Sequence, residues 1–101
     1  MPQFSANLSM LFPERPFLQR FAAAAQAGFS AVEFMFPYAF TIADLRDAIA
    51  HSKVRVVLHN LPPGDWDAGD RGIACHPNRT EEFRDSVAQA IAYASALQVP
   101  R

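Results

Sequence analysis

The segment VRVVLHNLPPGDWDAGDRGIACHPNR, residues 54–79, decides how the rest of the sequence is interpreted. It begins with an apolar run rich in β-branched residues, which is typical of a strand. The long connection that follows, residues 59–79, is unusual, because most strand-to-helix loops need only a few residues. Its Trp66, Ile73 and Pro77 can pack, and its aspartates and arginines can pair or bind. We therefore expect an ordered loop with a function.

Around this segment the chain alternates strands and helices. Strands are predicted over residues 3–8, 31–36 and 54–59, and helices over residues 15–28, 41–52 and 78–97. Four residues carry the helix-end signals: Gly28 ends the first helix, Thr41 caps the second, and Asn78 or Thr80 caps the third. The order β-α-β-α-β-α predicts an α/β fold with parallel strands. Because such crossovers are right-handed, all three helices should cover one face of the sheet.

The two faces of the predicted strands differ in polarity. The face expected to meet the helices is apolar and consists of Phe4, Ala6, Leu8, Val32, Phe34, Val54, Val56 and Leu58. The opposite face is more polar and consists of Ser5, Asn7, Ala31, Glu33, Met35, Arg55, Val57 and His59. A doubly wound sheet buries both faces and usually has continuous apolar strands. Polar residues near the carboxyl ends of strands suit the lumen of a (β/α)₈ barrel, where active sites lie at that end.

Composition limits the class of protein. The chain has 101 residues, half of them hydrophobic, and a net charge of −1. That balance gives no electrostatic case for nucleic acid, and no apolar run approaches the ~20 residues that span a membrane. The first residues lack the basic and apolar regions of a signal peptide, so we expect a cytoplasmic location. The single cysteine, Cys75, rules out an internal disulfide and is expected to be a small buried side chain of the loop.

Three motifs carry a family resemblance: ANLSMLF at residues 6–12, AGFSAVEFMFPY at residues 27–38, and NLPPGDWDAGDRGIACHPNR at residues 60–79. Together they resemble the hydroxypyruvate isomerase family, one of the xylose isomerase-like TIM barrels, which also include sugar epimerases and endonuclease IV. The resemblance implies that residues 1–101 form the N-terminal part of one TIM-barrel domain. They would be the first three βα units of a (β/α)₈ barrel, which typically needs ~250 residues, and the remaining five βα units are absent from this chain.

The resemblance also implies an activity. Members of the family interconvert hydroxypyruvate and tartronate semialdehyde through an enediolate, with two glutamates moving the proton and a divalent metal, Mg or Mn, holding the substrate oxygens. The metal ligands and both glutamates are expected beyond residue 101, so this chain alone is expected to be inactive. The expected partners are a small hydroxy or keto acid and further copies of the chain. The alternatives are a 2-oxo-tetronate isomerase, a sugar epimerase, or a non-catalytic, oligomerising barrel fragment.

Arg71 is the leading candidate for substrate binding. The substrate that the resemblance implies is a small carboxylate, and a guanidinium offers a planar, bidentate match to it. Gly69 and Gly72, which flank Arg71, would let the backbone approach closely. The alternative is a salt bridge within the loop, from Arg71 to Asp67 or Asp70.

Other candidates follow from their position at the carboxyl ends of the strands. The expected walls of the pocket are Asn7, Phe36, His59, Asn60 and Trp66, although core packing explains the two aromatic residues equally well.

Two further arrangements are weaker. Glu33 is the only acid on the lumen face and is a candidate catalytic carboxylate. A lone carboxylate is more often structural, however, and we expect it to pair with Arg55. His59, His76 and Asp65 match no compact metal-ligand motif, so no metal ligand is assigned within this chain.

Overall fold

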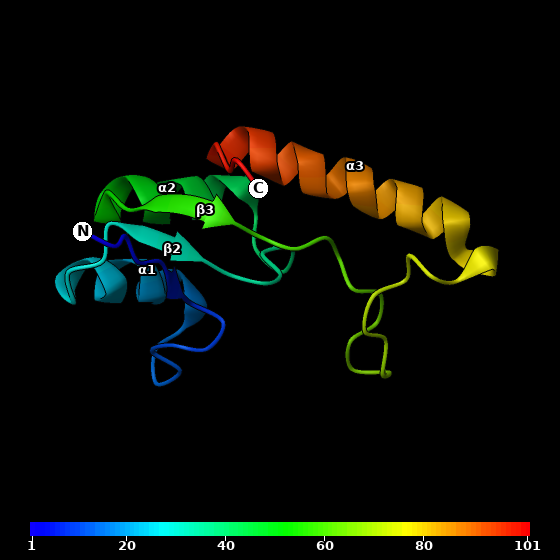
Figure 1. Cartoon of the computed structure of the whole chain (residues 1–101), viewed down its shortest axis with the longest axis horizontal. Coiled ribbons are helices and arrows are strands. Elements are labelled where there is room, and N and C mark those ends of the chain that lie inside the picture. The colour runs from blue at the N-terminus through cyan, green and yellow to red at the C-terminus, as the bar shows by residue number, and fades with distance from the viewer.

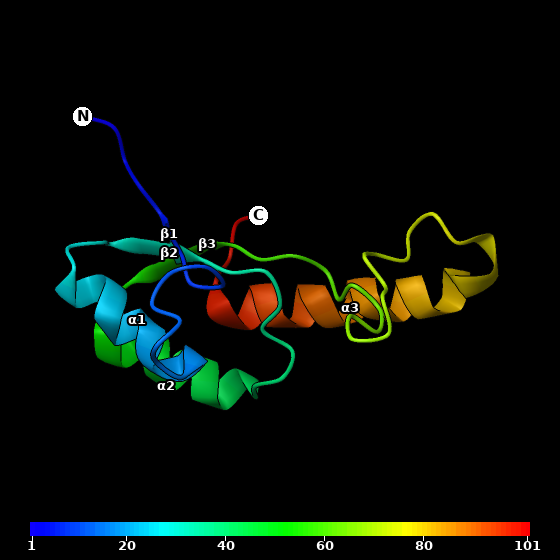
Figure 2. The ribbon, with the colours of Figure 1, turned by 90° about the horizontal axis from the view of Figure 1, so that it is seen from below.

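Three parallel strands form one sheet, and helices connect them. The computed structural model describes residues 1–101. Its elements, in chain order, are β1 (Ala6–Asn7), α1 (Phe17–Gln26), β2 (Ala31–Glu33), α2 (Ile42–Ser52), β3 (Arg55–Leu58), the 3₁₀ turn η1 (Pro77–Arg79) and α3 (Thr80–Leu97) (Figure 1). The strand order is β1-β2-β3, and the three helices lie on the same side of the sheet (Figure 2). The predicted α/β order and one-sided helix layer are therefore confirmed.

The helix ends follow local chemistry at two of the three predicted positions. Gly28 has a φ of +98°, and its N–H donates to Ala25 O while that of Phe29 donates to Ala24 O, each at 3.0 Å. Such paired bonds satisfy the last carbonyls of a helix. Thr41 Oγ1 accepts the N–H of Asp44 at 3.1 Å and caps α2.

The predicted cap of α3 is wrong. Neither Asn78 nor Thr80 caps this helix, because η1 begins at Pro77 and runs directly into it. Arg79 occupies the N-cap position without a side-chain hydrogen bond. The Thr80 hydroxyl instead donates to Pro77 O at 3.2 Å.

The core lies between the sheet and α1 and α2. Its largest fully buried side chains include Phe21, Phe34, Leu8 and Leu45. The ring of Phe34 meets those of Phe17 and Phe21 at 5.4 and 5.8 Å between centroids, both edge to face. Burying a side chain of this size stabilises a fold by roughly 1.5–3 kcal/mol.

Both strand faces depart from the alternating pattern at the ends of the strands. Phe4 is 71% exposed rather than buried, because β1 pairs only over two residues and Phe4 precedes it. Ala31, predicted to face the lumen, is on the side of the sheet where Arg55 covers it and is therefore buried. Arg55 pairs opposite Ala31 on the central strand, and its guanidinium reaches Gln3 at 3.4 Å. The Arg55 side chain therefore crosses over Ala31.

A β-bulge changes the last residues of β3. Val32 pairs with Val56, whereas the next residue, Glu33, pairs with Leu58, so Val57 is an extra residue. An extra residue reverses the alternation of side chains beyond it. As a result His59, predicted on the lumen face, is buried on the helix side, where its ring contacts α3 (Thr80–Leu97).

The end of the chain lies next to β3. After α3 the chain turns back, and the N–H of His59 donates to Arg101 O at 3.4 Å. On α3 the buried residues are Ser86, Ala90 and Leu97, whereas Ile91 is 60% exposed. None of the helices is both long and apolar enough to cross a membrane.

Candidate functional site

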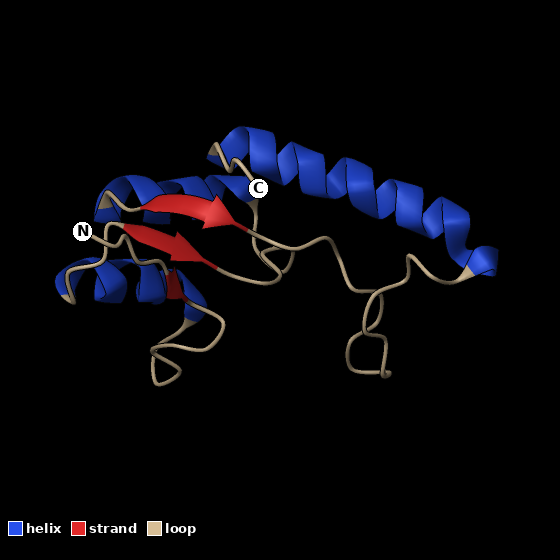
Figure 3. Ribbon diagram, viewed as in Figure 1, coloured by secondary structure: helices blue, strands red, loops and turns tan.

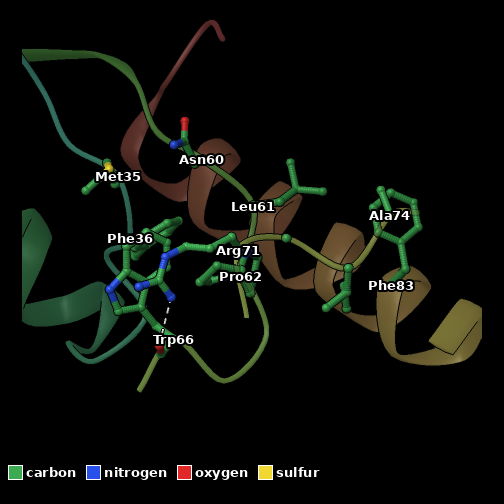
Figure 4. Close-up of a pocket in the computed structure, with 12 residues that line it drawn as sticks. Met35, Phe36, Asn60, Leu61, Pro62, Trp66, Arg71, Ala74 and Phe83 are labelled. Atoms are coloured by element: carbon green, nitrogen blue, oxygen red, sulfur yellow. Dashed lines mark hydrogen bonds between the residues drawn. The ribbon is translucent and has the colours of Figure 1, made fainter. Parts of the chain in front are cut away.

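A cleft lies at the carboxyl ends of β2 and β3 (Figure 4), and part of its lining comes from the long loop that joins β3 to α3 (Figure 3). Its volume is about 430 Å³, within the range that small-molecule sites occupy. The lining residues are Met35, Phe36, Asn60, Leu61, Pro62, Pro63, Trp66, Arg71, Gly72, Ile73, Ala74 and Phe83. Most are apolar, so the guanidinium of Arg71 and the amide of Asn60 are its main polar groups.

Arg71 is held against Trp66. Its guanidinium carbon lies 3.7 Å from the centroid of the Trp66 ring, a close cation–π contact. Nη1 donates to Trp66 O at 2.9 Å and to Asp70 O at 2.8 Å. Nε and Nη2 make no hydrogen bond within the protein, so one edge of the guanidinium is free for a ligand. The ring of Trp66 in turn packs on Phe36, with 5.2 Å between centroids (Figure 4).

The loop around Arg71 is closed by its own hydrogen bonds. Asp65 and Asp70 bind each other through two of them: the N–H of Asp65 donates to Asp70 Oδ2 at 2.7 Å, and the N–H of Asp70 donates to Asp65 O at 2.9 Å. The N–H of Gly72 donates to Pro63 O at 2.9 Å. Arg79, at the start of α3, donates through Nη2 to Asp70 Oδ2 at 2.8 Å. The long loop is therefore folded on itself and tied to the helix.

The hydrogen bonds between Arg79 and its two carboxylate partners shift the pKa values of all three groups. The hydrogen bond from Arg79, followed by that from the Asp65 N–H, lowers the pKa of Asp70 to about 2. Hydrogen bonds from Arg79 also lower the pKa of Glu82, which accepts from Nε and Nη2 at 2.8 Å each. These carboxylates raise the pKa of Arg79 in return. All three side chains stay charged at neutral pH.

A partly buried group of aromatic and polar side chains adjoins Asn60 of the cleft. The Tyr38 hydroxyl donates to Asn60 O, and its ring packs on Tyr93 and His59. Burial, with a smaller contribution from Tyr93, raises the pKa of Tyr38 to about 12. Burial also lowers the pKa of His59, partly offset by a contact between Nε2 and Ala90 O at 3.3 Å. Tyr38 and His59 are therefore neutral at neutral pH, and the Tyr38 hydroxyl holds the carbonyl of Asn60.

Comparison with known proteins identifies the family. The model of the xylose isomerase-like TIM barrel matches residues 21–101. The chain belongs to this family. It is 63% identical over 97 residues to hydroxypyruvate isomerase from Escherichia coli, and 48% identical over 97 residues to 2-oxo-tetronate isomerase from Cupriavidus necator. These alignments cover 96% of this chain, but 38% and 37% of the relatives, so the chain spans less than two fifths of their length.

A solved structure agrees with this assignment. The crystal structure described as AP endonuclease, family 2, from Brucella melitensis superposes with a TM-score of 0.95 at 50% identity. It covers 98% of this chain and 38% of that chain. The strands and helices of residues 1–101 therefore match part of a TIM-barrel structure.

Four of the predicted site residues meet in this part of the barrel: Arg71, Trp66, Phe36 and Asn60 all line the cleft. Their roles toward a ligand stay predictions. The alternative of a salt bridge within the loop is wrong for Arg71, which bonds to carbonyl oxygens and makes no ion pair with Asp67 or Asp70.

The other two predicted pocket residues lie elsewhere. Asn7 Oδ1 accepts the N–H of Ser9 at 3.0 Å and so closes the turn after β1. His59 lies under α3 because of the bulge in β3.

Glu33 and Cys75 differ from expectation in their surroundings. Glu33 makes no ion pair. The register places Arg55 opposite Ala31 rather than Glu33, and the guanidinium of Arg55 bonds to Gln3. No group of three or more His, Cys, Asp or Glu side chains is placed to hold a metal ion. Cys75 is exposed rather than buried.

Sequence reasoning missed several apolar residues of the cleft. Leu61, Pro62 and Pro63 follow β3 directly, and Ile73 and Phe83 come from the end of the loop and from α3. The signal for Phe83 was its place on the apolar face of the predicted helix. Because the loop folds back on that helix, this face serves the cleft rather than the sheet.

Proposed function

We propose that this chain supplies the first three βα units of the (β/α)₈ barrel of an isomerase that interconverts hydroxypyruvate and tartronate semialdehyde. The identity of 63% to the Escherichia coli hydroxypyruvate isomerase supports this choice. The observation that carries it is Arg71: an arginine without an ion-pair partner, with Nε and Nη2 free, at the edge of a cleft of about 430 Å³.

The chemistry assigns a role to each group in the cleft. Isomerisation through an enediolate moves one proton from C3 of hydroxypyruvate to C2 and one from the C3 hydroxyl to the C2 oxygen, while the carboxylate at C1 does not react. The free edge of Arg71 matches a carboxylate with two parallel hydrogen bonds. The rings of Trp66 and Phe36 form the wall next to it, and the amide of Asn60 offers one further polar contact. In this proposal the chain binds and orients the substrate.

The proton-transfer groups and the metal belong to other segments of the barrel. No three His, Cys, Asp or Glu side chains of residues 1–101 cluster as a metal site, and Glu33 has no second acid or base paired with it. We propose that a divalent metal, Mg or Mn, and two catalytic glutamates lie in the part of the barrel that the relatives have beyond this segment.

The nearest alternative is isomerisation of a 2-oxo-tetronate, a four-carbon acid with the same carboxylate. Three relatives named 2-oxo-tetronate isomerase are 43–48% identical to this chain, and the cleft would accept the additional carbon. A sugar epimerase has less support, since a sugar without a carboxylate leaves Arg71 unpaired. Cleavage of DNA is not favoured, because the net charge is −1.

A chimeric enzyme tests the role of Arg71. This chain would replace the matching segment of the Escherichia coli hydroxypyruvate isomerase, to which it is 63% identical. Arg71→Ala should lower kcat/KM for hydroxypyruvate by roughly 10- to 100-fold, because hydrogen bonds to a charged group contribute about 1.5–3 kcal/mol. Arg84→Ala, on the exposed surface of α3, is the matched control. An unchanged kcat/KM in Arg71→Ala would overturn the proposed carboxylate contact.

A further inference from the structure

The contacts of Asp70 reach both ends of the loop that carries Arg71. Its Oδ2 accepts the backbone N–H of Asp65 at 2.7 Å and Nη2 of Arg79 at 2.8 Å. Its carbonyl oxygen accepts Nη1 of Arg71 at 2.8 Å. One residue therefore links the start of the loop, the candidate binding arginine and the first turn of α3.

Arg79 fixes that link to the helix. It binds Glu82, three residues further on, through both Nε and Nη2, and binds Asp70 through Nη2 as well. Because two carboxylates hold the guanidinium of Arg79, it has little freedom to rotate, so it can keep Asp70 in place. The side chains of Asp70 and Arg79 are 23% and 26% exposed, so they are more sheltered than Glu82 at 50%.

The backbone near Asp70 is shaped to admit its carboxylate. At Gly64 a Cβ atom would stand 2.4 Å from Asp70 Oδ2 and 2.8 Å from Ile73 Cγ2. Any side chain at position 64 would therefore push Asp70 away from Asp65. The absence of a side chain there is a separate observation that the carboxylate is built into the loop.

We propose that Asp70 and Arg79 are positioning residues, which hold Arg71 against Trp66 so that its free edge faces the substrate carboxylate. This inference rests on the function proposed above. Neither residue lines the cleft, so each acts through Arg71. Misplacing a binding group by about 1 Å can cost up to about 100-fold in rate or affinity, which sets the scale of the effect.

The first arm of the test uses the chain itself and needs no activity. Trp66 is the only tryptophan, so its fluorescence reports directly on the contact with Arg71. Asp70→Asn should increase quenching of Trp66 by acrylamide to the level that Arg71→Ala produces. Asp67→Asn removes the same charge from the same loop, at a side chain without hydrogen bonds, and should leave quenching unchanged.

The second arm uses the chimeric enzyme. Asp70→Asn should raise KM for hydroxypyruvate by about 10-fold or more, with kcat changed by less than about 2-fold, because the reacting groups lie elsewhere. Adding Asp70→Asn to Arg71→Ala should raise KM no further, since the one acts through the other. Arg79→Lys should raise KM less than Arg79→Ala.

The outcomes separate the two proposals. If Arg71→Ala leaves kcat/KM unchanged, the proposed carboxylate contact is wrong, and the quenching arm alone decides whether Asp70 holds Arg71. If Arg71→Ala raises KM but Asp70→Asn does not, or if the two effects multiply in the double variant, the positioning role is wrong. A chimera without activity leaves the decision to the quenching arm, where equal quenching in Asp70→Asn and the unmodified chain overturns the proposal.

Discussion

Gly64→Ala is the sharpest test of how tightly the loop is built. Gly64 has a φ of +86°, a conformation that costs an L-residue about 1–2 kcal/mol. The new methyl group would also stand 2.4 Å from Asp70 Oδ2 and 2.8 Å from Ile73 Cγ2. Since Ile73 is buried, relief must come largely from moving Asp70. Forcing a methyl into a packed site costs typically about 1–3 kcal/mol more.

Gly69 provides the matched control. Its φ is +106°, so Gly69→Ala meets a similar backbone strain, but a Cβ there has no atom within 4 Å. The difference between the two variants therefore isolates the contact with Asp70 and Ile73. We expect Gly64→Ala to be less stable than Gly69→Ala by about 1–3 kcal/mol. In a domain of 150–250 residues that difference corresponds to a thermal midpoint lower by about 2–12 °C.

The measurement is thermal unfolding of the chimeric enzyme carrying each substitution, together with KM for hydroxypyruvate. Gly64→Ala should raise KM as Asp70→Asn does, because both displace the same carboxylate. Gly69→Ala should leave KM near that of the unmodified chimera. Equal midpoints in the two alanine variants would refute the reasoning, since the loop would then yield to the methyl without strain and could not hold Arg71 in a fixed place.

Three other predictions follow from the surroundings of single groups. Burial lowers the pKa of His59 below its usual 6.5, so below about pH 6.5 the unfolded chain takes up a proton that the folded chain resists. The contribution of neutral His59 to the free energy of unfolding is therefore full above about pH 6.5 and declines as the pH falls below it. His59→Gln should remove this decline, whereas His76→Gln should not. Glu33 has no ion pair, so Glu33→Gln in the chimera should change the thermal midpoint and kcat little, and a fall of kcat by orders of magnitude at a normal midpoint would identify it as catalytic. The chain alone should show no isomerase activity with or without Mg²⁺ or Mn²⁺. Light scattering should detect oligomers of it, because β1 and β3 are both edge strands, and a monodisperse monomer with a sharp cooperative melt would contradict that expectation.

The sequence predicted the order of the elements because each rests on a local signal. Gly28 and Thr41 mark helix ends by their own local chemistry, and the segment from Ala31 to Phe36 is apolar apart from Glu33, as suits a strand. These features need no knowledge of the rest of the chain. The family motif around Gly64 and Trp66 predicted where the site lies, since loops after parallel strands gather at one end of a sheet.

The wrong predictions for His59 and Arg55 share a different cause, because both positions depend on how residues of two strands pair. The extra residue Val57 in β3 leaves the pattern of the strand unchanged in sequence, yet it moves His59 from one face to the other. The register that sets Arg55 opposite Ala31 likewise separates Arg55 from Glu33. Neither outcome is encoded in the alternation of polar and apolar residues, because register is a property of two strands together.

The geometry also explains why a long loop follows β3. Residues that bind a substrate must be ordered before it arrives, or ordering them reduces the affinity. A short connection would leave Arg71 no room to turn back over Trp66, whereas a long one without internal bonds would be mobile. The bonds among Asp65, Asp70 and Arg79 resolve this conflict by closing the loop on itself and fastening it to α3. If Arg71 binds the substrate as proposed, its position is set by the N-cap residue of α3 rather than by the sheet, so changes at that helix end should alter substrate affinity before they alter the barrel.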